Sequence, residues 1–375
     1  MQSILKGIES LPEMVRELDC RKPMLVIDAS YPFLSIKDTV EALDVSCVKF
    51  DGFTPNPLFE QVCAGINLFL SEGCDSMIAV GGGSAIDVAK CIKLAVIARA
   101  GKDTLIPPLV SQKADLNEHI RIPFIAIPTT AGTGAESTHN AVIYFEGAKQ
   151  TVMDDAILPD VAILEPGVLK TLPLYQKKCT MMDALCQGIE SWWSVNSTDE
   201  SKEYSRKAVE LIIAHWKNYI FENDDKAADQ IMLAANYGGR AINLAQTTAA
   251  HAMSYKITSM YKLPHGHAVA VCLPAIWEFM VNNLDMCADI RGGKYVGQIF
   301  DTIAEALGCP SVSAAIQSIR NMMDAMRLER PVSDRFAEDI PILVASVNPV
   351  RLRNNPVALD EASISGIYQQ ILRNR

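Results

Sequence analysis

The segment SMIAVGGGSAIDVAK, residues 76–90, joins a short apolar run to three consecutive glycines and a helical pattern. This order predicts a buried strand, a tight turn and the start of a helix. Without side chains at Gly81, Gly82 and Gly83, backbone amides can approach an anion, and Ser84 can cap the helix whose positive dipole end faces it. A pyrophosphate fits such a turn. A plain glycine-rich turn also fits, since the spacing departs from the GxGxxG dinucleotide fingerprint.

Two charged residues follow within the same expected helix. Asp87 lies three residues after Ser84 and Lys90 three residues further, so they share roughly one helix face. Each of them either contacts a ligand or has a role without one. In the second case Asp87 is only a partner of the helix dipole and Lys90 only a solvated charge.

The chain around this segment alternates short apolar runs with amphipathic stretches, as βαβ units do. Strands are expected at residues 24–28, 46–50, 76–80 and 124–127, with helices at 58–72 and 85–98. After a last strand in PDVAILEP, helical patterns dominate, among them residues 201–216, 227–244 and 296–307. We therefore expect an N-terminal Rossmann-like α/β domain over residues 1–172, with a doubly wound parallel sheet, and an all-α domain over residues 173–375.

A second loop repeats the design of the first. In IPFIAIPTTAGTGAES, residues 122–137, an apolar run ends in small residues and hydroxyls. Thr129, Thr130 and Thr133 can donate to a phosphate or to a nicotinamide amide. Two such loops at the carboxyl ends of strands mark the crevice in which open α/β sheets bind ligands.

The second half of the chain carries candidate metal ligands. Asp183 and Gln187 are four residues apart on one expected helix face, and His251 and His265 are fourteen apart. A carboxylate with two neutral imidazoles is a common ligand set for Fe(II) or Zn(II), and an open position lets a carbonyl or alkoxide bind. His251 taken alone also fits a hydrogen-bonded core histidine, and the pairing with His265 favours the ligand. A dinucleotide loop together with a metal site suggests metal-assisted hydride transfer.

The other histidines have less context. His267 fits a hydrogen-bonding partner of a ligand, a proton relay or a surface residue. His119, His139 and His215 are expected to be structural.

Composition excludes several classes of protein. The net charge of −10 argues against a nucleic-acid or anionic-membrane surface, because both need clustered lysine and arginine. Ten scattered cysteines without CxxC spacing, no signal-peptide core and no membrane-length apolar run favour a reduced, soluble, cytoplasmic protein.

Five ordered motifs resemble those of the iron-containing alcohol dehydrogenase family over nearly the whole chain: GGGSAIDVAK, PTTAGTGAES, DDAILPDVAILEP, DALCQGIES and the pair HAMSY with PHGHAVAV. The resemblance implies the dehydroquinate synthase-like fold of that family. It also implies NAD(H), with NADP(H) as the alternative, and a divalent metal, with Fe(II) expected first and Zn(II) second. A homodimer or larger assembly is expected.

The resemblance carries the family's cofactor positions onto this chain. Asp28 matches the acidic position that contacts the adenosine ribose, and its charge would repel the 2′-phosphate of NADP. The full set of implied cofactor-binding residues is Asp28, Asn56, Gly82, Gly83, Ser84, Asp87, Thr129, Thr130, Thr133, Asn140 and Lys149.

The implied metal site departs from the family's pattern. Asp183, His251 and His265 match three of four ligands, whereas Gln187 stands where DALTH has histidine and offers only a neutral amide oxygen. Tyr255 replaces another histidine of the family. Tyr255 and His267 are the expected proton donors.

The stretch GGRAINLAQTTAAHAMSYK, residues 238–256, is more polar than in members that act on simple alcohols. Its donors Arg240, Thr247, Thr248 and Lys256, with Gln246, suit an anionic substrate, although Arg240 and Lys256 also fit surface charges. With DALCQ, ESWWSVNST and PHGHAV, this stretch resembles the branch that contains phosphonoacetaldehyde reductases. We expect metal-assisted reduction of a small anionic aldehyde, namely phosphonoacetaldehyde to 2-hydroxyethylphosphonate. The alternatives are a short-chain alcohol dehydrogenase or aldehyde reductase, a metal-free reductase of the same fold, a dehydroquinate synthase-like lyase, and a non-enzymatic binding or filament-forming subunit.

Overall fold

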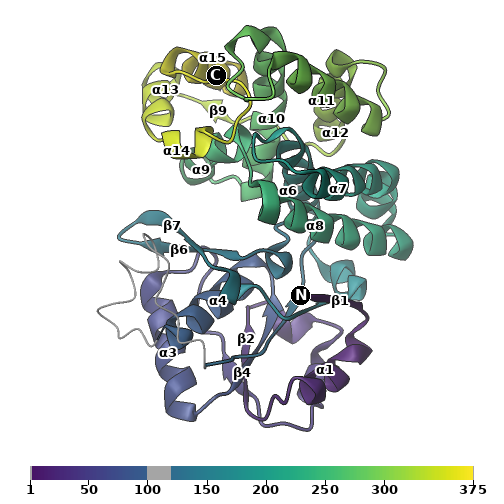
Figure 1. Cartoon of the computed structure of the whole chain (residues 1–375), viewed down its shortest axis with the longest axis vertical. Coiled ribbons are helices and arrows are strands. Elements are labelled where there is room, and N and C mark those ends of the chain that lie inside the picture. Colours follow the sequence, from purple (N-terminus) through teal and green to yellow (C-terminus); the bar gives the residue numbers. More distant parts are fainter. Residues whose placement is uncertain (1, 99–119, 375) are drawn as a thin grey trace. The chain divides into compact units, whose positions relative to one another are not determined.

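The computed structural model describes residues 2–98 and 120–374 and divides the chain into two compact units, Met1–Leu172 and Pro173–Arg375 (Figure 1). The first unit is built around a parallel sheet, and the second consists almost entirely of helices. The predicted combination of an α/β and an all-α part is confirmed. Among the described residues, no helix is both long and apolar enough to span a bilayer. All ten cysteines are free thiols.

The first unit contains six parallel strands in the spatial order β1, β8, β5, β4, β2, β3. Their bounds are Ser3–Lys6 (β1), Pro23–Ile27 (β2), Val48–Phe50 (β3), Ser76–Gly81 (β4), Phe124–Pro128 (β5) and Val161–Leu164 (β8). By the right-handed rule for parallel crossovers, this strand order puts α1 (Leu11–Glu17) and α2 (Lys37–Glu41) on one face and α3 (Phe59–Glu72) and α4 (Gly83–Ile97) on the other. Figure 1 shows α1 and α3 on opposite sides of the strands. The winding direction reverses between β2 and β4, and ligands bind at such switch points.

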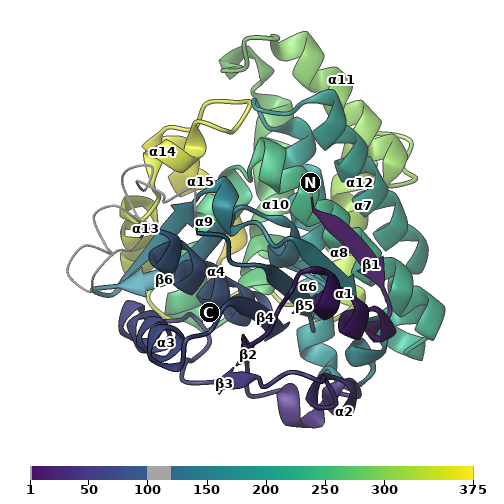
Figure 2. The ribbon, with the colours of Figure 1, turned by 60° about the horizontal axis from the view of Figure 1, so that its bottom comes forward.

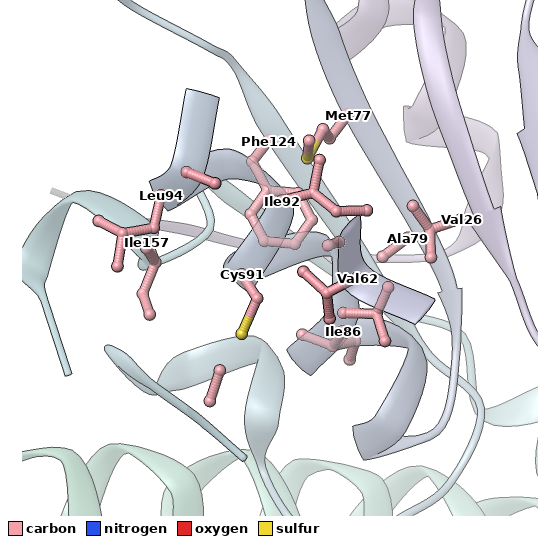
Figure 3. Close-up of a cluster of buried hydrophobic side chains, with 14 of the residues drawn as sticks. Val26, Val62, Met77, Ala79, Ile86, Cys91, Ile92, Leu94, Phe124 and Ile157 are labelled. Atoms are coloured by element: carbon pink, nitrogen blue, oxygen red, sulfur yellow. The ribbon is translucent and has the colours of Figure 1, made fainter. Parts of the chain in front are cut away.

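The core of this unit lies under α4. Ile86 and Ile92 of this helix pack over Met77 of β4 and Phe124 of β5, and all four side chains are fully buried (Figure 3). Each such side chain contributes about 1.5–3 kcal/mol by burial. Tight packing holds the first turn of α4 directly beyond the end of β4.

Two features of the sheet region were not among the expected elements. Strand β1 pairs with β8, and β6 (Asn140–Phe145) forms an antiparallel hairpin with β7 (Ala148–Met153). The hairpin packs against α4. The chain therefore returns from the second glycine loop over the helix that begins at the first loop.

The second unit is arranged around α6, which packs against α7, α8, α10 and α11. The bounds of its helices are Leu174–Trp193 (α6), Asp199–Lys217 (α7), Asp225–Ala245 (α8), Ala249–Tyr261 (α9), His265–Asn282 (α10), Gly293–Ala306 (α11), Val312–Ala325 (α12), Phe336–Ala345 (α13), Pro349–Leu352 (α14) and Glu361–Ile371 (α15). Strands β9 (Val332–Ser333) and β10 (Arg373–Asn374) form one short parallel pair. Helices α13, α14 and α15 gather beside α9 and α10, as Figures 1 and 2 show. This arrangement brings segments 90 to 100 positions apart in sequence next to each other, as with Tyr255 and Arg351, 96 positions apart.

Candidate functional site

The glycine turn lies at the switch point of the first unit. A Cβ on Gly81 would stand 2.6 Å from both Asp28 Oδ2 and Ala85 Cβ, so only glycine fits there without a shift. The carboxylate of Asp28, just after β2, accepts a hydrogen bond of 2.9 Å from the N–H of Gly82. Gly82 is the N-cap of α4, and Ser84 lies inside the first turn, so the prediction that Ser84 caps the helix was wrong.

The second loop lies directly against the first. Thr129 donates its N–H to the carbonyl of Gly81 at 3.0 Å, and Thr133 Oγ1 stands 3.0 Å from the position of a Cβ on Gly83. Thr130 Cγ2 lies 3.5 Å from the corresponding position on Gly82. The structure thus brings the predicted glycine and threonine residues together at the carboxyl ends of β4 and β5.

Lys90 of α4 holds the second loop through three hydrogen bonds. Its fully buried ammonium donates to the carbonyls of Ala135 and Asn140 at 2.6 and 2.8 Å and to Thr138 Oγ1 at 2.9 Å. Burial lowers the pKa of Lys90 to about 8, against the opposing effect of Asp87. The solvated-charge alternative is therefore wrong for Lys90, which connects α4 to the loop and the start of β6.

The remaining cofactor candidates surround these loops. Asp87 accepts a hydrogen bond of 3.0 Å from the N–H of Val142, and burial raises the pKa of Asp87 to about 6. Lys149 on β7 acts electrostatically on the same carboxyl. Asn56 has a left-handed backbone with φ 59° and donates its N–H to Ser84 Oγ at 3.4 Å. The hairpin and the segment before α3 therefore flank the first turn of α4.

The second unit assembles a compact group of metal-ligand atoms from three helices. Asp183 of α6 places Oδ1 at 3.4 Å from His251 Nε2 of α9 and at 3.8 Å from His265 Nε2 of α10. All three ligand atoms lie within 4.8 Å of one another. A Cβ on Gly266 would stand 2.0 Å from the carbonyl oxygen of Cys179, so the glycine lets α10 begin in contact with α6. The motif PHG, which was expected at a helix start, thus places His265 in the centre.

Gln187 lies one helical turn beyond Asp183. Its Nε2 is 3.5 Å from Asp183 Oδ2, and its side chain is buried. Gly238 of α8 faces it, because a Cβ there would stand 3.4 Å from Gln187 Oε1. The expected fourth ligand position therefore lies beside the three closely spaced residues.

Glu190, which the sequence reasoning missed, organises this centre. Its Oε2 pairs with His251 Nδ1, while Oε1 accepts from Thr248 N, Thr248 Oγ1 and Ala250 N at 2.9–3.0 Å. This fully buried carboxylate caps the N-terminus of α9 and orients the imidazole so that Nε2 points to Asp183. A polar stripe at positions 183, 187 and 190 of an otherwise apolar helix is the signal that could have found it.

The electrostatics of the centre favour a cation. Burial tends to lower the pKa of His251, but Glu190 and Asp183 outweigh this effect and raise it to about 10. His251 Nε2 is buried and makes no hydrogen bond within residues 2–98 and 120–374. An imidazole held by Glu190 through Nδ1, with Nε2 directed toward the buried Asp183 carboxylate, is suited to a divalent metal.

His267 and Tyr255 have different surroundings. His267 Nε2 is 2.9 Å from the carbonyl of Glu329, which only accepts, so Nε2 carries the proton and Nδ1 accepts from the Tyr175 hydroxyl at 2.9 Å. Tyr255 stacks on His265, with ring centroids 5.7 Å apart and planes 7° from parallel. Of the two expected proton donors, Tyr255 is therefore the one that contacts a residue of the centre directly.

The chain matches the iron-containing alcohol dehydrogenase family over residues 5–166 and the C-terminal domain of the Fe-containing alcohol dehydrogenase family over residues 178–372. It belongs to the iron-containing alcohol dehydrogenase family. The chain is therefore an oxidoreductase of the alcohol dehydrogenase and aldehyde reductase class.

Individual relatives agree with this assignment. A phosphonoacetaldehyde reductase of Streptomyces viridochromogenes is 32% identical over 88% of this chain and 83% of its own length. Alcohol dehydrogenase 4 of Schizosaccharomyces pombe is 30% identical over 94% of this chain and 82% of its own length. The crystal structure of a sulfoacetaldehyde reductase from Bifidobacterium kashiwanohense in complex with NAD+ has the same fold, with a TM-score of 0.86, 24% identity and coverage of 99% of this chain and 96% of that chain.

The expected substrate residues of this iron-containing alcohol dehydrogenase are not brought together. The Thr248 hydroxyl bonds to Glu190 and to the indole of Trp193, so it supports the centre from within the core. Thr247 contributes its carbonyl to Asn354, and Lys256 lies half-buried on α9.

Arg240 is directed elsewhere on α8. It is two residues from Gly238, about 200° around the helix, whereas Gly238 faces Gln187. Its guanidinium instead lies 4.1 Å from the ring centroid of Tyr204 on α7 and bonds to that hydroxyl. The structure therefore directs the Arg240 guanidinium toward Tyr204, and its expected contact with the substrate stays a prediction.

The histidines expected to be structural include one with a clear contact. His139 Nδ1 pairs with Asp155 Oδ1 at 2.8 Å. His119 lies outside the described residues.

Proposed function

We propose that this protein reduces a small anionic aldehyde with NADH, and that phosphonoacetaldehyde, which becomes 2-hydroxyethylphosphonate, is the substrate. The close grouping of Asp183, His251 and His265, with the first two buried and His251 backed by Glu190, is the observation that carries the proposal. The 32% identity to a phosphonoacetaldehyde reductase and the fold shared with a sulfoacetaldehyde reductase bound to NAD+ support the substrate class and the cofactor.

The first unit would hold the cofactor. The amides around Gly82 and Gly83, with Ser84, would bind the pyrophosphate at the N-terminus of α4. Asp28, directly after β2, would bind the adenosine ribose and favour NAD(H) over NADP(H). The further candidates are Asn56, Asp87, Thr129, Thr130, Thr133, Asn140 and Lys149.

The second unit would hold the metal. Distances of 3.4 and 3.8 Å from Asp183 Oδ1 to the two imidazole nitrogens suit ligands placed about 2.0–2.2 Å from one ion. Gln187 would add an amide oxygen, a neutral donor in place of the family's imidazole. Fe(II) is our first assignment and Zn(II) the alternative. A bound divalent cation would supply Lewis-acid polarisation of the carbonyl, and NADH would supply the hydride.

The protein's own groups would orient the substrate and deliver the proton. Glu190 fixes His251 with Nε2 directed toward Asp183. Tyr255, stacked on His265, would give the proton to the developing alkoxide, since His267 directs its N–H to a backbone carbonyl.

The test is NADH oxidation, followed by nicotinamide absorbance, against phosphonoacetaldehyde, sulfoacetaldehyde, glycolaldehyde and propanal side by side. Each aldehyde consumes one NADH and one proton and yields one alcohol and one NAD+. The proposal expects the highest kcat/KM with phosphonoacetaldehyde, and a preference for propanal would refute the anionic substrate.

Elemental analysis of the same sample distinguishes Fe from Zn and from a metal-free reductase. Light scattering during chromatography tests the expected homodimer, and cell fractionation tests the cytoplasmic location.

A further inference from the structure

Arg351 on α14 lies over the ring of Tyr255, which stacks on His265 of the candidate metal centre. Its Nη1 donates to the Tyr255 hydroxyl at 3.0 Å, and its guanidinium carbon stands 5.1 Å from the centroid of the Tyr255 ring. Tyr255 in turn stacks on His265 at 5.7 Å, and His265 meets His251 edge-on at 5.4 Å. The Arg351 guanidinium is therefore separated from the His265 imidazole by one aromatic ring, that of Tyr255.

The segment that carries Arg351 is held against the start of α9. Asn354 donates its amide to Gln246 Oε1 at 2.9 Å and to the Thr247 carbonyl at 3.2 Å. Its backbone carbonyl also accepts from the N–H of Val195. Gln246 has φ 61° and ψ 165°, a backbone conformation that is costly for a residue with a side chain and persists only where its surroundings hold it. These bonds fix the position of Arg351 relative to Tyr255.

The chemistry of this position suits an anion. The centre presents the Asp183 carboxylate, and the Glu190 carboxylate lies directly behind His251, so it repels an anionic substituent and attracts the polarised end of a substrate only through a cation. A phosphonate or sulfonate therefore needs a separate cationic partner, set back from the ligands by about the length of a small molecule. A guanidinium presents five donors in a planar fork, which matches the oxygens of such a group.

Arg240 provides an internal comparison. It has the same partner chemistry as Arg351, a tyrosine ring beneath the guanidinium and a bond to the phenol, but its tyrosine is Tyr204, which stacks on Tyr237 and not on a histidine of the centre. The difference between the two pairs is their neighbours.

We propose that Arg351, positioned by Tyr255, binds the anionic substituent of the substrate and determines the preference for anionic over neutral aldehydes. The identity of the aldehyde rests on the function proposed above, whereas the anion subsite rests on the Arg351 geometry.

The experiment compares Arg351→Gln, Arg351→Lys and the control Arg240→Gln with the wild type, each loaded with Fe(II) and assayed with NADH. The readout is the ratio of kcat/KM for phosphonoacetaldehyde to that for propanal, in which any effect on proton delivery cancels. Loss of one charged hydrogen-bonding partner should lower this ratio about 10- to 100-fold in Arg351→Gln, chiefly through KM for the anionic aldehyde. Arg351→Lys should recover part of the ratio, and Arg240→Gln should leave it unchanged.

Two outcomes overturn the subsite. One is an Arg351→Gln variant that slows both aldehydes in the same proportion, and the other is an equal change of the ratio in Arg240→Gln. If the wild type does not reduce phosphonoacetaldehyde, the proposed function fails, and calorimetric titration with methylphosphonate then decides the subsite. Binding by the wild type and Arg240→Gln but not by Arg351→Gln supports it, and no binding by the wild type refutes it.

Discussion

The two candidate sites of this chain use different chemistry on different scaffolds. In the first unit, backbone amides and small side chains gather where two neighbouring strands end, within residues 81–84 and 129–134. In the second unit, side chains from α6, α9 and α10 converge, and a buried carboxylate orients one of them. The first site depends on the missing side chains of its glycines, which leave room for close contacts. The second depends on the charged groups of Asp183, His251 and Glu190. Substitutions in one unit should therefore leave the binding function of the other intact.

His251→Ala should have the largest effect. It removes a proposed metal ligand and leaves Glu190 and Asp183 as two buried carboxylates without the imidazole between them. We expect metal content and kcat/KM to fall by more than about 100-fold, beyond the loss typical for a residue that only supports a ligand. Elemental analysis and NADH oxidation measure both quantities, and calorimetric NADH binding should be unchanged. Undiminished turnover would rule out the metal role.

Glu190→Gln should have the next largest effect. It keeps an acceptor for the N-terminus of α9 but removes the charge opposite His251 Nδ1. Metal affinity should fall about 10- to 100-fold, as for other hydrogen-bonding partners of metal-bound histidines. The control is Glu278→Gln, which removes one carboxylate from a surface ion pair with Arg320. Equal losses in the two variants would remove Glu190 from the site.

The pH dependence of metal binding provides an independent signature of Glu190. Burial tends to lower the pKa of His251, and Glu190 with Asp183 raises it to about 10, so the imidazole is protonated at neutral pH until a cation displaces the Nε2 proton. The apparent metal affinity of the wild type should rise about tenfold per pH unit between about pH 6 and about pH 9 and level off above the pKa of His251. In Glu190→Gln, the pKa of His251 should be lower, so the rise in metal affinity should end at a lower pH. Identical profiles in both proteins would contradict this account.

Gly81→Ala tests the other side of the comparison. The new Cβ would meet Asp28 Oδ2 and Ala85 Cβ at 2.6 Å, which should cost about 1–3 kcal/mol of stability and weaken NADH binding. Metal affinity should not change. The control is Gly366→Ala in α15, where nothing lies within 4 Å of the added Cβ. Thermal unfolding and calorimetry measure the effects, and unchanged NADH affinity would separate this turn from the cofactor.

Local signals explain what the sequence predicted. The glycine turn, the threonine loop and the helix-starting PHG each reside in a few consecutive residues, and the structure places all three at strand ends or at a helix start. The short edge strand β1 was missed because its four residues gain meaning only through β8, more than 150 positions away. Ser84 was misplaced as a cap because the helix begins at Gly83, two residues earlier than a Ser84 cap would place its start.

Long-range contacts explain what the sequence did not predict. Glu190 lies in a quoted motif, but its role depends on the start of α9, about 60 positions further on. Arg351 meets Tyr255 across 96 positions, and no local pattern distinguishes it from other arginines. Arg240 was chosen as a cationic donor in the polar stretch 238–256, and sequence alone did not show that helical rotation turns it toward Tyr204.

Asp28→Asn should have the smallest effect and sharpens the reading of the first site. The amide oxygen can still accept from the N–H of Gly82, so the turn should keep its geometry while the negative charge at the end of β2 is lost. Without that charge, the 2′-phosphate of NADPH is no longer repelled, and its affinity should rise about tenfold, with NADH affinity little changed. The control is Asp51→Asn, an exposed residue directly after β3 that changes the net charge by the same amount. Calorimetric titration of both nucleotides checks the prediction. A parallel change in NADPH affinity in the control would show that overall charge, and not the position of Asp28, sets the cofactor preference.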